Sequence, residues 1–246
     1  MKRALVLGLT LAVALFTAGC GRADDAFGNR VRAYLLEHPE VIEEAVQKLQ
    51  EKRLAEAAEV ARAGLAKHRE ALERDPRDFV ANPDGKITVV EFFDYRCGYC
   101  KVTAPEILQI IEENPDVRFV FKEFPIFGGV SDLAARVALS PQAKPKTLEL
   151  YRRFMAEKSL DEAAIDRHLR AIGVDPAAAK AGGSTPEIDK QIADVRALAQ
   201  ALAIEGTPAF VVGDRMIPGA DIPALRAAIA QAKGGELKAA PNPDLS

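Results

Sequence analysis

The sequence predicts an α/β fold, because strand patterns and helical patterns alternate along its second half. Residues 86–93 are mostly apolar, which is typical of a central strand buried on both faces of a parallel or mixed sheet. Residues 102–113 have helical character, and an apolar strand follows at 117–121, completing a strand-helix-strand unit. Two short apolar runs separated by a Gly-Asp turn predict a hairpin at 209–217.

The segment between these sheet signals predicts a helical insertion. Residues 130–204 contain several helical patterns and no convincing strand. A last helix is expected at 222–232, and the tail 236–246 is expected to be disordered because it is short, terminal and rich in proline. The α/β domain as a whole is therefore predicted to span residues 80–235.

An N-terminal helical extension is predicted at residues 27–75, which are rich in Ala, Glu, Lys, Arg and Leu. Ile42, Val46 and Leu49 follow a nearly heptad spacing. A helix with so narrow an apolar stripe gains most of its stability from packing. We therefore favour a homo-oligomer formed through residues 27–72, with packing on the chain's own domain and a solvated helical spacer as alternatives.

The first residues predict an export signal. Lys2 and Arg3 precede an uncharged apolar run, Ala4–Phe16, that is shorter than the roughly 17–25 residues of a membrane-spanning helix. The small residues before Cys20 resemble a lipobox, which implies a signal of residues 1–19 and lipidation of Cys20. Ordinary cleavage after Ala23 fits the small-residue rule equally well. Both readings place the mature protein in the periplasm, tethered to the membrane if Cys20 is lipidated.

Composition excludes other broad classes of protein. The chain has 246 residues and is 48% hydrophobic, which is enough for a sizeable core. Its 33 basic and 36 acidic residues leave a net charge of -3, and no cationic block is long enough to attract nucleic acid. Nucleic acid is therefore not an expected partner.

The cysteines indicate chemistry rather than structural cross-linking. Of the three in the chain, Cys20 falls at the export signal, so Cys97 and Cys100 remain. A disulfide between them closes a minimal loop and stabilises very little. A zinc site lacks a second cysteine pair, and covalent haem attachment requires His where Lys101 stands. No metal or cofactor is expected, and a redox-active Cys97–Cys100 disulfide takes that place.

The position of the two cysteines predicts their roles. Cys97 lies between a strand and a helix, where unpaired amide groups and the helix dipole stabilise a thiolate. We expect Cys97 to be an exposed nucleophile. Cys100 falls one turn into the helix, where it can attack a mixed disulfide formed by Cys97 and so release the client.

Residues 91–101, EFFDYRCGYCK, resemble the active-site segment of the DsbA-like thiol:disulfide oxidoreductases. Residues 206–210 are similar to the cis-proline loop of that family, and residues 121–125 to its second strand. The helical insertion is also typical of the family. The resemblance covers about residues 80–235 and implies a thioredoxin fold with a helical insertion, preceded here by the helical extension.

The resemblance also implies site residues. It implies a cis peptide bond between Thr207 and Pro208, with Pro208 shaping the groove for a client strand. Glu91 matches the position of an acidic residue of the family and could relay a proton for Cys100, although an exposed Glu at a strand end is the simpler alternative. Lys122 and Glu123 are weaker candidates, because one of two adjacent strand residues normally points to solvent.

The function that follows is that of a protein thiol-disulfide oxidoreductase, either an oxidase or an isomerase. Gly98, Tyr99 and Thr207 resemble the disulfide isomerases and the ScsC-like branch of the family, and the N-terminal helix agrees with them. The expected partners are unfolded or misoxidised exported proteins and a membrane redox partner of unknown identity. The alternative function is an oligomeric periplasmic chaperone or scaffold whose cysteine pair is only a redox sensor.

Overall fold

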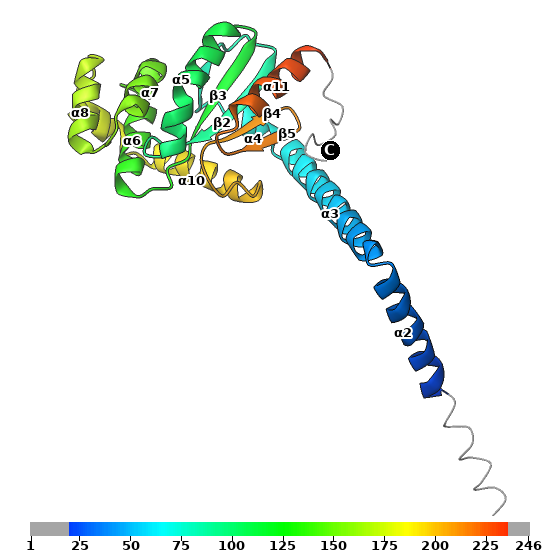
Figure 1. The fold of residues 1–246 in the computed structure, drawn as a ribbon. Coiled ribbons are helices and arrows are strands. Elements are labelled where there is room, and N and C mark those ends of the chain that lie inside the picture. Colours follow the sequence, from blue (N-terminus) through cyan, green and yellow to red (C-terminus); the bar gives the residue numbers. More distant parts are fainter. Residues whose placement is uncertain (1–19, 236–246) are drawn as a thin grey trace, which may run out of the picture. The chain divides into compact units, whose positions relative to one another are not determined.

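The computed structural model describes residues 20–235, with helices packed on both faces of one five-stranded sheet (Figure 1). The predicted export signal at 1–19 and the tail at 236–246 lie outside the described residues. The chain divides into two compact units, one up to Glu59 and one from Val60 onwards. Within residues 20–235, no helix combines the length and the apolar character needed to cross a membrane.

The sheet has a parallel centre and antiparallel edges. Its strand order is β1-β3-β2-β4-β5, and only β2 and β3 among these neighbours run parallel, with Val90 opposite Val120. The strands are β1 (Phe79–Ala81), β2 (Ile87–Phe93), β3 (Val117–Glu123), β4 (Ala209–Val212) and β5 (Arg215–Pro218). The predicted strand pair and hairpin are confirmed. The short edge strand β1 was not predicted, because it follows a turn-rich stretch.

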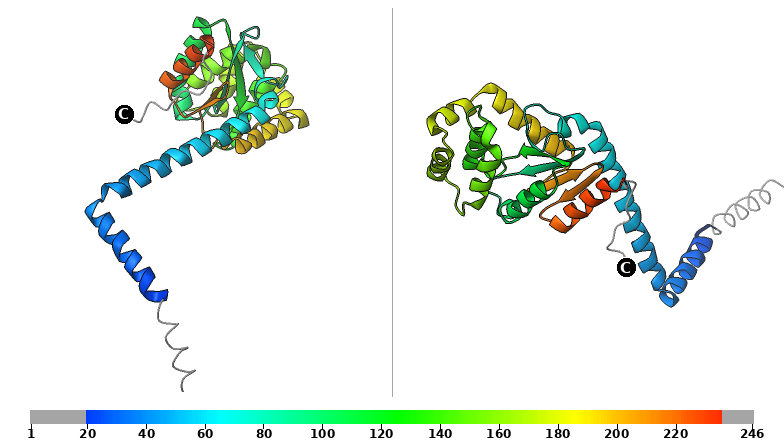
Figure 2. Two further views of the ribbon diagram at one scale, coloured as in Figure 1. Left: turned by 90° about the vertical axis from the view of Figure 1, so that its right-hand side faces the viewer. Right: turned by 90° about the horizontal axis from the view of Figure 1, so that it is seen from above.

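The side chains of β2 point alternately to the two faces of the sheet, and each face borders its own hydrophobic core. Val89 and Phe93 face the larger core, which includes residues of α5 (Gly98–Glu113) and α11 (Ile222–Lys233). Val90 and Phe92 face the second core, which includes residues of α10 (Pro186–Ala201). The two views in Figure 2 show α11 and α10 on opposite sides of the sheet. Both faces of β2 are therefore covered, as its continuous apolar sequence predicts.

The predicted helical insertion is confirmed between β3 and β4. It consists of α6 (Gly129–Leu139), a 3-10 turn (Lys144–Lys146), α7 (Thr147–Ala156), α8 (Glu162–Ala171), α9 (Pro176–Gly183) and α10. Helix α9 was not predicted, because its alanines and glycines carry no amphipathic pattern. Asp175 is the N-cap residue of α9, and its carboxylate accepts a hydrogen bond from the Ala178 amide at 3.1 Å. Pro176, the first residue of the helix, suits its first turn.

The N-terminal extension forms three helices, α2 (Cys20–Glu37), α3 (Glu40–Lys67) and α4 (Arg69–Glu73). Pro39 separates the first two, because the residue before proline avoids the helical conformation. Leu65 and Leu72 are buried in the second core, so the end of α3 and all of α4 belong to the larger unit. The predicted oligomerising segment, residues 27–72, therefore spans the boundary between the two units at Glu59.

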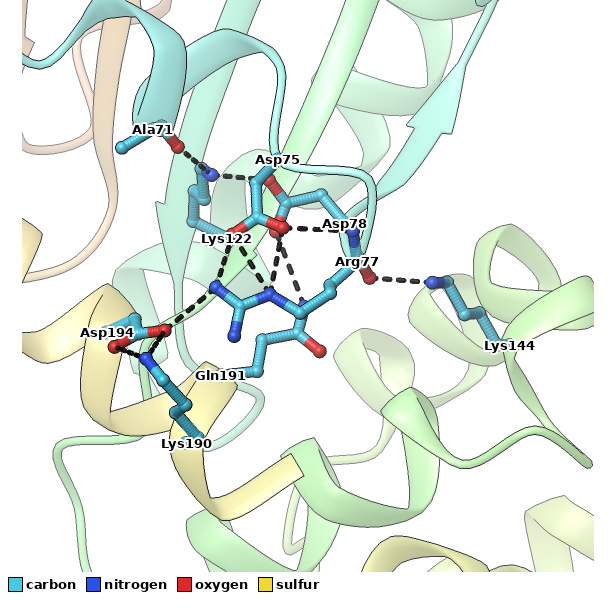
Figure 3. Close-up of polar contacts among 9 residues, drawn as sticks. All are labelled: Ala71, Asp75, Arg77, Asp78, Lys122, Lys144, Lys190, Gln191 and Asp194. Carbon is cyan, nitrogen blue, oxygen red and sulfur yellow. Dashed lines mark hydrogen bonds and ion pairs between the residues drawn. The ribbon is translucent and has the colours of Figure 1, made fainter. Parts of the chain in front are cut away.

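A buried ion pair joins α4, β3 and the segment before β1 (Figure 3). The Lys122 ammonium is 1% exposed, pairs with Asp78, and donates to the Ala71 carbonyl oxygen at 2.5 Å. Gln191 of α10 donates to the second Asp78 oxygen at 3.5 Å. Burial raises the pKa of Asp78 to about 6, and the Lys122 ammonium opposes that rise.

Lys122→Met is expected to lower the free energy of unfolding by about 3–5 kcal/mol at pH 7, because it leaves Asp78 buried without its counter-ion. Lys190→Met is the matched control, since Lys190 forms an exposed pair with Asp194 that contributes at most about 1 kcal/mol. Urea unfolding of both variants provides the comparison. Equal losses of stability in the two variants would contradict a structural role for the buried pair.

Candidate active site

Cys97 is the N-cap residue of α5, the position that the sequence predicts for it. Its backbone is extended, and its Sγ accepts a hydrogen bond from the Cys100 amide at 3.5 Å. The turn before it is closed by the Cys97 amide, which donates to the Asp94 carbonyl oxygen at 3.1 Å. The sulfur therefore occupies the place where a helix offers unpaired N–H groups to an anion.

This environment lowers the pKa of Cys97 to about 6. A hydrogen bond from the Cys100 side chain is the largest cause, partial burial opposes it, and the Thr207 hydroxyl and the amides of Cys100 and Tyr99 contribute further. A thiol with this pKa is largely ionised at neutral pH.

Cys100 has the opposite character. It is 0% exposed, and burial raises its pKa far above the ordinary value for a thiol, helped by the hydrogen bond to Cys97 and by the charge of Glu91. Both cysteines are free thiols here. One acidic sulfur therefore lies directly beside one that retains its proton.

The peptide bond between Thr207 and Pro208 is cis, the geometry that the resemblance implies. The Cys97 thiol donates to the Thr207 carbonyl oxygen at 3.1 Å, so the loop before β4 lies directly against the Cys97 sulfur. Thr207 Oγ1 is buried and forms no hydrogen bond of normal geometry among the described residues, but it lies close enough to the Cys97 sulfur to stabilise the thiolate. It is therefore available to donate to the sulfur when Cys97 ionises.

The expectation that Cys97 is exposed is wrong. The residue is 2% exposed, while its neighbours Arg96, Gly98 and Tyr99 are exposed. The reason is the contact with Thr207, which covers the sulfur in a way that sequence spacing does not reveal.

Glu91 is fully buried, so the alternative of an exposed strand-end Glu is wrong. It lies on the same face of β2 as Val89 and Phe93, in the core shared with Cys97 and Cys100. The Tyr151 hydroxyl of α7 donates to both carboxylate oxygens, at 3.1 and 3.3 Å. Burial raises the pKa of Glu91 to about 8, which the Tyr151 hydrogen bond opposes.

Lys122 and Glu123 are both buried, so the expectation that one of them points to solvent is also wrong. β3 is an inner strand, and both of its faces are covered by core. The Tyr95 hydroxyl donates to Glu123 Oε1 at 2.8 Å, and burial raises the pKa of Glu123 well above its ordinary value.

The structure adds residues to the site that sequence reasoning did not assign. Tyr151 lies far from Glu91 in the sequence, and no motif marks it. Tyr95 and Asp94 lie within residues 91–101, so their position close to Cys97 in the sequence could have marked them as candidate site residues. Within residues 20–235, no cluster of three or more His, Cys, Asp or Glu residues could hold a metal ion.

Comparisons with known proteins agree with this geometry. The family described as "DSBA-like thioredoxin domain" matches residues 88–230, and the "Copper resistance protein ScsC N-terminal domain" matches residues 25–56. The chain is similar to the crystal structure of BcfH from Salmonella enterica Typhimurium, with a TM-score of 0.70, 33% identity, and coverage of 91% of this chain and 100% of that one.

Two further relatives support the match. A thioredoxin-like oxidoreductase from Silicibacter pomeroyi has a TM-score of 0.64 and 37% identity, covering 68% of this chain and 98% of that one. The thiol:disulfide interchange protein DsbA of Bordetella pertussis is 30% identical over 139 residues, which cover 53% of this chain and 65% of that protein. The chain thus spans less than two thirds of that curated relative's length.

The matched family covers more than half of the chain and includes both cysteines, the cis-proline loop and the helical insertion. The chain therefore belongs to the DsbA-like thioredoxin domain family of thiol-disulfide oxidoreductases and carries an N-terminal segment of the ScsC type.

Proposed function

We propose that this protein rearranges disulfide bonds in exported proteins, acting as a thiol-disulfide isomerase through Cys97 and Cys100. The observation that carries the proposal is the placement of two adjacent sulfurs, with Cys97 at the N-cap of α5 and Cys100 buried within the first turn of the helix. Cys97 has a pKa of about 6 at the start of α5, while burial raises the pKa of Cys100 far above the ordinary value. Such a difference assigns nucleophile and resolving thiol to separate residues.

The exchange proceeds through a mixed disulfide. The Cys97 thiolate attacks one sulfur of a client disulfide, forming an enzyme-client S–S bond and releasing one client thiolate. In isomerisation, another client thiolate then attacks the client sulfur of that bond, so Cys97 leaves as a thiolate and no net oxidation occurs. Alternatively, Cys100 attacks Cys97, which reduces the client by two electrons and leaves the Cys97–Cys100 disulfide.

The direction of catalysis is inferred from the ScsC-type N-terminal segment, and the acidity of Cys97 agrees with it. Its pKa of about 6 lies nearer to the value of about 7 in thioredoxin than to about 3.5 in the strongly oxidising DsbA. A moderately acidic thiol stabilises the reduced enzyme less, and it remains a good nucleophile. Oxidation is the second candidate direction, because the Bordetella relative is named a thiol:disulfide interchange protein DsbA.

Glu91 is proposed to accept the proton of Cys100 when Cys100 attacks the mixed disulfide. Its carboxyl is fully buried on the face of β2 that borders the core containing Cys100, and its charge raises the pKa of Cys100. With a pKa of about 8, Glu91 can both hold and release a proton near neutral pH.

The N-terminal helices are proposed to join copies of the chain. Val46 and Leu49 on α3 are 49% and 48% exposed, and Phe27 and Tyr34 on α2 are 61% and 55% exposed. None of these four side chains belongs to a hydrophobic core cluster of the described residues. Several active sites held together would raise the effective concentration of thiolates around one scrambled client.

The protein is also proposed to act in the periplasm together with a membrane redox partner. One similar structure is described as a periplasmic thioredoxin-like protein from Salmonella enterica serovar Typhimurium, and the same compartment is proposed here. Cys20, the first residue of α2, remains the proposed lipidation site if the signal ends before it. A membrane redox partner would restore the active redox state of the cysteine pair, which serves in place of a bound cofactor.

Cys100→Ala is expected to accumulate a covalent mixed disulfide with a scrambled client, because the resolving thiol is missing. Thiolate absorbance at 240 nm in the same variant reports the Cys97 titration. Its midpoint is expected to rise above pH 6, since the variant also removes the Cys100 hydrogen bond. Cys97→Ser must lose both signals. If Cys97→Ser instead keeps the main activity as client holding, the chaperone alternative replaces the enzyme.

Glu91→Gln is expected to slow resolution of the mixed disulfide on the order of 10²-fold and to remove its rise with pH near 8. Because folding raises the pKa of Glu91 from about 4.5 to about 8, Glu91 ionises first in the unfolded chain, and the folded state loses stability as the pH rises through this range. The difference in the free energy of unfolding between Glu91→Gln and the wild type should therefore favour the variant more at pH 8 than at pH 5. Stopped-flow kinetics and urea unfolding test the two effects, and a retained pH step would contradict the relay.

Val46→Glu combined with Leu49→Glu is expected to yield monomers by light scattering, because both changes place charge on the proposed interface while keeping helix propensity. Reshuffling of a scrambled client should slow by at least about tenfold, and oxidation of a reduced client should stay within about twofold. Gln47→Glu on the same helix is the control. An unchanged molar mass, or equal loss of both reactions, would refute the role.

A further inference from the structure

Asp94 is a buried carboxylate with four hydrogen-bond donors close to Cys97. It is 2% exposed. Its Oδ1 accepts from the Arg96 amide at 2.7 Å and from Ser131 Oγ at 2.8 Å. Its Oδ2 accepts from the amides of Ile126 at 2.7 Å and Phe127 at 3.2 Å. The proposed reaction uses none of these contacts, although the residue is three positions from the nucleophile.

These contacts tie together two segments that are distant in the sequence. One is the turn from Asp94 to Cys97, which the Cys97 amide closes on the Asp94 carbonyl oxygen. The other is the loop 124–128, which joins β3 to α6. Arg96 adds a second link, because its Nη1 donates to the Phe127 carbonyl oxygen at 3.1 Å. The loop is therefore attached to the turn that carries the reactive sulfur.

The attached loop presents apolar surface. Ile126 is 38% exposed and Phe127 is 49% exposed, in a chain whose other phenylalanines from Phe79 onwards are mostly buried. Tyr99, 72% exposed, lies on the other side of Cys97 along the chain. An unfolded client offers apolar segments of this kind next to its cysteines, because it has not yet buried them.

We propose that Asp94 is a positioning residue for protein clients, holding the Ile126–Phe127 loop beside Cys97 so that apolar contacts and sulfur exchange occur together. The proposal rests on the thiol-disulfide exchange proposed above. Asp94 touches neither the client nor the sulfur through its carboxylate. It acts by fixing the distance between an apolar contact and the thiolate.

A carboxylate suits this task better than an amide. Two acceptor oxygens satisfy two backbone N–H groups on one side and an N–H and a hydroxyl on the other. Charge makes each of these bonds stronger than a neutral one. Asparagine has one acceptor oxygen, and its NH₂ group would face donors, so Asp94→Asn must release either the loop or the turn.

Substrate size separates this role from a general structural one. A small disulfide such as oxidised glutathione needs only the Cys97 thiolate, whereas a protein client also needs the apolar contact. Loss of positioning should therefore appear in the KM of the protein client and spare both the small-disulfide reaction and the thiolate titration.

The test compares scrambled ribonuclease A with oxidised glutathione, using the full-length protein. Asp94→Asn is expected to raise KM for ribonuclease about tenfold, with kcat within about twofold. The rate with glutathione and the Cys97 titration midpoint should be unchanged. Ser131→Ala, which removes one of the four donors, should shift KM in the same direction by about two- to threefold. Asp161→Asn, at the N-cap of α8, is the control for loss of a carboxylate cap elsewhere.

A second comparison tests whether Asp94 acts through the loop. Phe127→Ser alone should raise KM for ribonuclease about as much as Asp94→Asn, and the double variant should be little worse than either single one. Additive effects, or an equal fall in the glutathione rate in Asp94→Asn, would overturn the inference while leaving the proposed function intact. A wild-type protein that reacts with glutathione and leaves ribonuclease unchanged would overturn both.

Discussion

The site depends on the contacts that stabilise the negative charge of the Cys97 thiolate. Cys97 caps α5, so its thiolate faces amide groups at a helix start, receives a hydrogen bond from Cys100, and lies against the Thr207 loop. These three contacts differ in how far apart the contacting residues lie in the sequence. The cap is local, Cys100 lies one turn further along, and Thr207 lies in the loop before β4, more than a hundred residues away in the sequence.

Beneath the sulfurs, the protein buries polar groups that most cores exclude. The Tyr151 hydroxyl of α7 donates to Glu91 of β2, and the Tyr95 hydroxyl, in the turn between β2 and α5, donates to Glu123 of β3. Burial keeps these carboxyls protonated to higher pH than ordinary carboxyls. The pKa of Cys97 is lowered at the helix start, whereas burial raises the pKa of Cys100, and thiol-disulfide exchange uses that difference.

The helical insertion and the N-terminal extension have different physical relations to this site. The insertion supplies Tyr151 from α7 and Gln191 from α10, so it completes both the Glu91 pair and the buried Lys122 pair. The extension contributes Leu65 and Leu72 to the second core, and its earlier part exposes apolar side chains. The unit from Val60 onwards thus contains the extension residues that pack into the second core, and the unit up to Glu59 contains most of those whose apolar side chains are exposed.

Local patterns were sufficient for much of this molecule. The continuous apolar run of β2, the helix after the cysteines, the hairpin and the helical insertion were all predicted, because periodicity and turn chemistry act over a few residues. The same holds for the placement of Cys97 at a helix start. Elements without such patterns were missed: β1 is three residues long, and α9 consists mainly of Ala and Gly.

By itself, the sequence determined the fold class, the reactive pair and its place at a helix N-terminus, since these depend on neighbouring residues. Only the tertiary structure decided that Cys97 is covered by Thr207, that Glu91 is buried against Tyr151, and that Asp94 holds the loop of Ile126. Those contacts join residues far apart in the chain. Burial and the pKa shifts that follow from it exist only once distant segments have packed together.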